Sequence, residues 1–228
     1  MLKPSHFGFL LASLIFLCSI GRTRPWILRG LSRSIASIRR TKPRVDRPPA
    51  VLSPNTTNTD EFFLRLALKE AYRAAREDEV PIGALVVSRH NQRVLARQHN
   101  RVEQRRDATA HAEVLALRQA ARRSGNWRLY NTTLYSTVEP CVMCCAAAQA
   151  FRVDRIVYGA PDRRLGGIVS HVQLLNVTHP YHTIENVQGG VCAEECGSAM
   201  RDFFRDKRKQ KRKDHDRTTN KGKHNPGR

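Results

Sequence analysis

Three residues of the chain have the types and the spacing of a catalytic zinc site. His111 precedes the pair Cys141 and Cys144, which are three positions apart and directly follow Pro140. A catalytic zinc takes three protein ligands and keeps one position open, and one imidazole with two thiolates meets that requirement. Because residues i and i+3 share one side of a helix, both sulfur atoms can face a single ion. The pattern therefore predicts one Zn²⁺ per chain.

Glu113 is the residue that we expect to move protons beside this ion. It lies two positions after His111, which is about 200° round an ideal helix. This position does not favour a second ligand next to His111. A carboxylate beside zinc-activated water can take its proton and pass it to a ring nitrogen and a leaving amine. The chemistry indicated is the hydrolytic removal of an exocyclic amino group.

A purely structural zinc site is the alternative, and it normally has four protein ligands. Cys145 is the candidate for a fourth ligand, but its side chain should point about 100° away from that of Cys144. We therefore expect Cys145 to be a packed core thiol. Cys192 and Cys196 lie one helical turn apart, and we expect ordinary helix residues there, with a redox or metal role as the alternative.

The hydrophobic pattern from Asp60 onward predicts a layered α/β domain that positions these residues. Apolar residues recur at helical spacing after Asp60, which is a plausible helix cap. Strand patterns then alternate with helical patterns, as in layered α/β domains. The predicted strands are residues 82–88, 94–99, 132–138 and 155–159, and the later predicted helices are residues 109–124, 142–151 and 193–211. Segments 172–175 and 183–186 show no clear pattern.

The formal net charge of +20 is concentrated at the two ends of the chain. Residues 1–60 and 201–228 contribute +8 each, and residues 61–200 contribute only +4. This distribution predicts a nearly balanced domain between two basic arms. A basic arm indicates a polyanionic partner or a targeting signal, not a particular fold.

The first 47 residues have the composition of a targeting segment. Residues 7–20 are an unbroken run of apolar or small residues, too short for a membrane span but suited to the apolar region of a signal peptide. Residues 21–47 contain eight Arg, three Ser and one acid, which is typical of a transit peptide. We expect two-step import into a plastid, with a mitochondrion or the endoplasmic reticulum, a plain signal peptide or a short anchor as alternatives. No stable membrane association is expected after processing.

Four stretches of the chain closely resemble the TadA-type tRNA-specific adenosine deaminases. They are residues 79–84, 107–113, 133–144 and 202–205. The resemblance covers residues 60–209 and implies a three-layer α/β/α sandwich around a five-stranded mixed sheet. It also implies a homodimer that deaminates the wobble adenosine of a tRNA anticodon to inosine. His99 and Ala108 depart from the family, which commonly has tryptophan and proline there.

The resemblance also implies how the substrate is held. Asn100 matches the asparagine that contacts the flipped nucleoside, and Ala112, Asp162 and Arg205 are further expected substrate-binding residues. The expected partner is a tRNA anticodon stem-loop, whose unpaired bases are accessible to a protein. The basic run in the last helix is expected to neutralise its phosphates.

The resulting division of the chain is a targeting segment (1–47), a linker (48–59), a zinc deaminase domain (60–209) and a basic disordered tail (210–228).

The main alternative function is deamination of a free base or nucleoside, of the guanine or cytosine type, which would not need a basic C-terminal helix. A non-catalytic RNA-holding subunit is a second alternative, but Glu113 is present. A secreted protein glycosylated at Asn55, Asn131 and Asn176 is a third.

Overall fold

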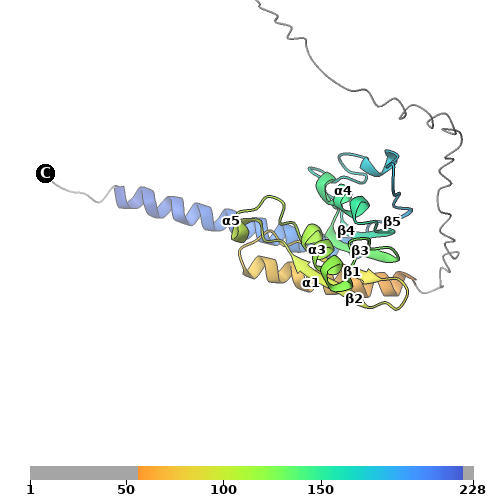
Figure 1. Ribbon diagram of the computed structural model, residues 1–228. Coiled ribbons are helices and arrows are strands. Elements are labelled where there is room, and N and C mark those ends of the chain that lie inside the picture. The colour runs from red at the N-terminus through yellow and green to blue at the C-terminus, as the bar shows by residue number, and fades with distance from the viewer. Residues whose placement is uncertain (1–55, 223–228) are drawn as a thin grey trace, which may run out of the picture. The chain divides into compact units, whose positions relative to one another are not determined.

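A mixed five-stranded sheet forms the centre of the domain in the computed structural model, which describes residues 56–222 (Figure 1). The strand order is β2-β1-β3-β4-β5. The pairs β2–β1 and β1–β3 are antiparallel, and the pairs β3–β4 and β4–β5 are parallel. The strands are β1 (Gly83–Ser88), β2 (Val94–His99), β3 (Thr132–Val138), β4 (Arg155–Ala160) and β5 (Asn186–Gln188). The predicted leader and most of the predicted linker lie outside the described residues.

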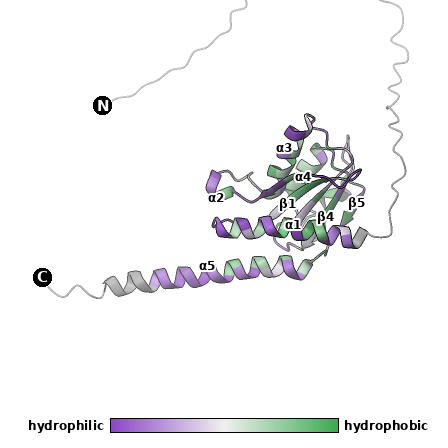
Figure 2. Cartoon of the chain, turned by 90° about the horizontal axis from the view of Figure 1, so that it is seen from below, coloured by the Kyte–Doolittle hydropathy of each residue, from purple (hydrophilic) through white to green (hydrophobic). Residues whose placement is uncertain are grey.

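Helices cover both faces of this sheet, so successive residues of a central strand enter different cores. Ala84 and Val86 of β1 pack with one pair of helices, whereas Leu85 and Val87 pack with the other pair. The first pair is α3 (Ala112–Ser124) and α4 (Val142–Ala150), and the second is α1 (Thr56–Arg76) and α5 (Ala193–Gly222). Figure 2 shows the two pairs on opposite sides of the sheet. The predicted three-layer α/β/α sandwich is confirmed.

The buried carboxylate of Asp60 connects α1 to strands β3 and β4 of the sheet. Asp60 accepts hydrogen bonds of 2.7 Å from both Nη atoms of Arg155 and one of 2.8 Å from the Tyr135 hydroxyl. The sequence suggested Asp60 as the cap of this helix, but α1 already begins at Thr56. The side chain of Asp60 therefore joins α1 to β3 and β4, and does not cap the helix.

The last helix is longer than the sequence analysis predicted. α5 continues to Gly222, so residues 210–222 are helical and not a disordered tail; residues 223–228 lie outside the described part. Lysine, arginine and glutamine are good helix formers, and Gln210 Nε2 donates to Asp214 one turn further on, over 3.2 Å. None of the helices within residues 56–222 is both long and apolar enough to cross a membrane.

Short elements account for the segments without a clear pattern. The 3₁₀ turn Leu174–Asn176 and strand β5 lie in the long connection after β4. The four-residue helix α2 (Val102–Arg105) was not predicted. Helix α3 begins at Ala112, three residues after its predicted start, and this shift leaves His111 at its N-cap.

Candidate metal and active site

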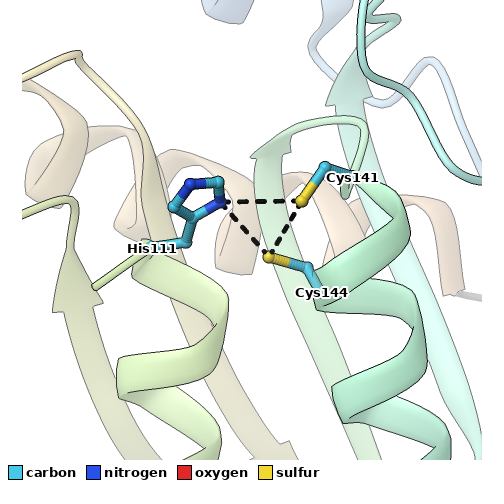
Figure 3. A group of neighbouring side chains, drawn as sticks. All are labelled: His111, Cys141 and Cys144. Atoms are coloured by element: carbon cyan, nitrogen blue, oxygen red, sulfur yellow. Dashed lines mark hydrogen bonds between the residues drawn. The ribbon is translucent and has the colours of Figure 1, made fainter. Parts of the chain in front are cut away.

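The two helices on one face of the sheet present their N-termini to a common point. His111 is the N-cap of α3 and Cys141 is the N-cap of α4, both with extended backbone. Cys144 lies in the first turn of α4. Figure 3 shows the imidazole reaching across from the start of α3 to the two thiols at the start of α4. A helix N-terminus stabilises a nearby thiolate, so both the position and the charge of these groups follow from the fold.

The three side chains fit a zinc ion. His111 Nδ1, Cys141 Sγ and Cys144 Sγ lie 3.6 Å from one another in all three pairs. With zinc–nitrogen and zinc–sulfur bonds of about 2.0–2.1 and 2.3 Å, tetrahedral ligands would be separated by about 3.6 Å (N to S) and about 3.8 Å (S to S). Within residues 58–215 this is the group of three metal-ligating side chains close enough to hold one ion. The donor set and its spacing therefore match zinc.

The pKa values of the two thiols are shifted in opposite directions in this arrangement. The hydrogen bond between the two sulfur atoms lowers the pKa of Cys141 to about 4, and His111 adds to this effect while burial opposes it. The same hydrogen bond, together with burial, raises the pKa of Cys144. Cys141 is thus the thiolate of the pair, and binding of a cation would release the proton held on Cys144.

Cys145 does not join this group. Its side chain is fully buried in the core formed by α3, α4 and the sheet, and its thiol points to the carbonyl of Pro140, 3.5 Å away. Burial raises the pKa of this thiol to about 12. Three side chains of the described residues could therefore hold an ion here, and no fourth joins the group. Catalytic zinc sites have three protein ligands.

Glu113 lies beside the metal-binding group and is buried, as is Cys144, whereas His111 and Cys141 are partly exposed. Its Oε2 is 3.5 Å from Cys144 Sγ, and its Oε1 accepts a 2.9 Å hydrogen bond from the Ser136 hydroxyl. Burial raises the pKa of Glu113, although its own backbone N–H and Ser136 favour the ionised form. A carboxyl group with a raised pKa can both accept and return a proton near neutral pH.

A cavity of about 730 Å³ opens next to these residues. His111 lies in its wall together with residues from the ends of β3 and β4, from α2 and from the inner half of α5. Two arginines, Arg164 and Arg201, and one aromatic ring, Phe204, are among the lining residues. The lining also contains four acidic side chains, Glu79, Glu103, Asp162 and Glu194, and Arg201 is ion-paired with Glu194. The cavity therefore offers a planar ligand an aromatic ring and charged groups of both signs beside the metal-binding group.

Asn100, which the resemblance implies as a contact of the nucleoside, lies in the wall of the cavity. Its Nδ2 donates to Glu79 Oε2 over 3.1 Å, and the other oxygen of Glu79 accepts from the backbone N–H of Gln104 over 2.7 Å. Glu79 and Asn100 are both buried and both line the cavity. Glu79 thereby fixes the amide of Asn100 and ties it to α2. The sequence analysis did not single out Glu79, although it lies in a stretch that resembles the family.

A second buried carboxylate holds the loop that carries Asp162. Glu139 accepts hydrogen bonds from four backbone N–H groups, over 2.7 to 3.2 Å; the donors are Asp162, Ile168, Val169 and Ser170. Burial opposes ionisation, but hydrogen bonds led by that from Ser170 lower the pKa of Glu139 overall. A Cβ on Gly166 would come within 2.5 Å of Glu139 Cδ, so only glycine permits this approach. Glu139 is a second residue that the sequence analysis missed.

Two of the expected substrate-binding side chains lie away from the cavity. Asp162 lines it and accepts from the N–H groups of Arg164 and Leu165. Ala112, in contrast, is buried in the core. Arg205 does not line the cavity and pairs with Asp202 over 2.8 Å. Arg201, one turn earlier on α5, takes the place in the cavity wall that was expected for Arg205.

Known proteins resemble the chain in both sequence and structure. A family model described as the cytidine and deoxycytidylate deaminase zinc-binding region matches residues 57–160. The tRNA-specific adenosine deaminase of Bacillus subtilis (strain 168) is 42% identical over 153 residues, which are 67% of this chain and 93% of that protein. A solved structure from a study of A-to-I editing by tRNA:A34 deaminases has a TM-score of 0.57 and 40% identity, and the match covers 60% of this chain and 98% of the other.

A plant relative is also similar but much longer. The chloroplastic tRNA(adenine(34)) deaminase of Arabidopsis thaliana is 40% identical over 160 residues. These residues are 64% of this chain but only 12% of the plant protein.

Replacing Cys144 and Cys145 with serine, one at a time, distinguishes the proposed metal-binding thiol from the core thiol. Cys144→Ser should reduce the zinc content from about one per chain to nearly none, because the ion loses one of three protein ligands. Cys145→Ser, the matched control, should keep its zinc, because that thiol points to Pro140. Zinc content would be measured by atomic absorption on purified full-length chains. Equal zinc loss in both variants would contradict the assignment.

Proposed function

We propose that this chain, which belongs to the family of tRNA-specific adenosine deaminases, converts the adenosine at the wobble position (34) of a tRNA anticodon to inosine. The observation that carries the proposal is the buried Glu113 beside the His111–Cys141–Cys144 group, of which His111 lines the cavity. The relatives that match over most of their own length are named tRNA-specific adenosine deaminases, and position 34 is named for the plant relative and for the solved structure.

The reaction exchanges an amino group for an oxygen, so adenosine and water give inosine and ammonia. His111, Cys141 and Cys144 would hold a zinc ion, which would supply the Lewis acidity that makes water a nucleophile near neutral pH. Glu113 takes the proton of the attacking water, because its carboxylate is buried at the site and is oriented by the Ser136 hydroxyl. It then delivers protons to the ring nitrogen and to the departing amino group. The raised pKa of Glu113 suits this return of the proton.

The target base must leave its stack to reach this site, because a deaminase cannot attack an atom inside a helix. The cavity offers a planar side chain and cations for a flipped nucleotide and its phosphates, in Phe204, Arg164 and Arg201. Asn100, fixed by Glu79, is placed to hydrogen-bond the nucleoside. Deamination of a free base or nucleoside is not favoured, because the relatives are named for tRNA and the cavity continues onto a basic helix.

The direct test is incubation of the full-length chain with a tRNA that carries adenosine at position 34, followed by detection of inosine. We expect inosine at that position alone. Glu113→Gln should lower the rate by about 10²–10⁴-fold, because the proton transfers lose their acid and base. The variant should keep about one zinc per chain.

Two results would contradict the proposal. Equal turnover of free adenosine or cytidine would show that tRNA is not the substrate. Loss of zinc from the Glu113→Gln protein would show that this residue is a ligand, not the proton carrier.

We also propose that two chains form a homodimer. The connection between β4 and β5 exposes five large apolar side chains, and Val142 at the start of α4 is exposed as well; the five are Leu165, Val169, Val172, Val177 and Tyr181. Contiguous exposed apolar surface commonly marks an interface. Sedimentation equilibrium should give about twice the 25.9 kDa of one chain. A mass of one chain at micromolar concentration would contradict the dimer.

A plastid is the proposed location of the mature enzyme. One similar protein is chloroplastic, and residues 7–20 followed by the arginine-rich residues 21–47 have the composition of a two-part import signal. Both segments lie outside the described residues, so two-step import stays a prediction. A fluorescent protein fused after residue 60 should enter plastids in plant cells, and its appearance in the medium would contradict this location.

A further inference from the structure

A buried imidazole lies directly before Asn100 and contacts two carboxylates. His99 is the last residue of β2 and is 1% exposed. Its Nε2 lies 3.0 Å from Glu77 Oε2, and its Nδ1 lies 3.5 Å from Glu70 Oε2. Carboxylates cannot donate a hydrogen bond, so the ring can satisfy both of them only when both of its nitrogens carry a proton.

The ring nitrogen that faces Glu77 also faces a donor. Arg101 Nε lies 3.2 Å from His99 Nε2, and a guanidinium can only donate. Nε2 therefore accepts from Arg101 when it is unprotonated and donates to Glu77 when it is protonated. Because one atom cannot do both, the site has two alternative hydrogen-bond arrangements that differ by one proton.

The residues that follow His99 belong to the wall of the active-site cavity and to its support. Asn100, the proposed contact of the nucleoside, donates its side-chain amide to Glu79. The backbone N–H of Arg101 donates over 3.0 Å to the carbonyl of Ala110, which directly precedes the metal-binding histidine. One peptide group joins His99 to Asn100, so a movement of the buried ring is passed to the backbone of Asn100.

The carboxylate of Glu77 keeps its charge when the pH falls. The hydrogen bonds with His99 and then with Arg73 lower the pKa of Glu77, although burial opposes them. In the described part of the chain, the charged groups in contact with the ring come from α1 (Glu70), from the residue after α1 (Glu77) and from the segment after β2 (Arg101). An imidazole is the type of side chain that changes its charge between about pH 5 and 8. The ring therefore decides which arrangement is present.

A second buried histidine shows the contrast. His182 Nε2 lies 2.6 Å from the backbone carbonyl of Val153, and a carbonyl needs one N–H from the ring, which a neutral imidazole supplies. No carboxylate is paired with His182 among the described residues. This histidine is therefore a matched control for the loss of a buried imidazole.

We propose that His99 is a positioning residue for Asn100, and that it aligns Asn100 when both ring nitrogens are protonated and bound between Glu70 and Glu77. The proposal rests on the function proposed above and adds a pH-dependent determinant of substrate binding. When Nε2 loses its proton, it accepts from Arg101 and its hydrogen bond to Glu77 is lost. The alignment is therefore complete at lower pH and is lost as the pH rises through the titration of the ring.

The first test needs no substrate. The side-chain amide signal of Asn100 would be followed by ¹⁵N NMR in the full-length chain from about pH 5.5 to about pH 8.5, where imidazoles titrate. It should shift together with the ring nitrogens of His99, both of which should be protonated at the lower pH. In His99→Gln, which cannot titrate, the Asn100 signal should stay in place. In the control His182→Gln it should shift as in the unmodified chain.

Two results of this test would overturn the proposal. One is an Asn100 signal that does not follow the titration of His99. The other is a signal that shifts equally in the unmodified chain and in His99→Gln, because another group would then cause the shift.

Inosine formation tests the effect on the reaction. Over the same pH range the KM of the unmodified chain for a tRNA with A34 should rise by about 3- to 10-fold, as expected for one weakened hydrogen bond. The kcat should not follow the KM, because Glu113 and the metal-binding group are unchanged. The rise in KM should be absent from His99→Gln and present in His182→Gln.

A double variant tests whether His99 acts through Asn100. At low pH, His99→Gln together with Asn100→Ala should have the KM of Asn100→Ala alone, because residues that act through one contact are not additive. Independent, additive increases in KM would show that His99 supports the fold in general and would contradict a positioning role.

The two kinds of measurement separate this proposal from the proposed function. An unmodified chain in which the Asn100 signal follows His99, but which makes no inosine, would contradict the deaminase function and leave the link between the two residues in place. Normal inosine formation with a KM that is independent of pH would overturn the role of His99 alone.

Discussion

The structure depends on one requirement, which is that three ligand atoms from two separate helices meet within 3.6 Å of one another. The parallel pairing of β3 and β4 meets it by placing α4, which connects them, next to α3 on the same face of the sheet. His111 and Cys141 are the N-caps of these helices, so backbone geometry positions them and the helix N-termini favour negative charge there. The second layer of helices and the buried Asp60–Arg155 pair then hold the sheet on which both rest.

Buried carboxylates act as anchors throughout the domain, and each has enough donors to offset its loss of hydration. Asp60 accepts from Arg155 and Tyr135, Glu79 from Asn100 and a backbone N–H, and Glu139 from four backbone N–H groups. A buried charge without partners would be costly, so these contacts fix the groups around the cavity. Glu113 accepts from the Ser136 hydroxyl and the Cys144 thiol, yet burial leaves its pKa raised, whereas the pKa of Glu139 is lowered. The opposite shifts separate Glu139 from the carboxylate that we propose carries protons.

The sequence predicts the chemistry and the layers well because both depend on local spacing. The i, i+3 cysteines with His111 indicate a group that could hold a metal ion, and the helical and strand patterns indicate the sandwich; the structure brings that group together and has that fold. Contacts between distant segments could not be predicted in this way. Nothing local shows that Glu139 binds the loop at residues 162–170, or that Arg201 and not Arg205 faces the cavity. His99 stands where the family commonly has tryptophan, and it is buried. Its Nε2 is 3.0 Å from Glu77 and its Nδ1 is 3.5 Å from Glu70, so α1 and the residue after it supply carboxylate partners for this imidazole.

The central claim is that His111, Cys141 and Cys144 form a three-ligand catalytic zinc site, and X-ray absorption at the zinc edge of the purified full-length chain tests it most directly. The geometry predicts one zinc per chain with two sulfur neighbours at about 2.3 Å and one imidazole nitrogen at about 2.0–2.1 Å. A spectrum with three or four sulfur neighbours would show that Cys145 or another thiol closes the site. Such a closed site would be structural, and it would contradict the catalytic assignment.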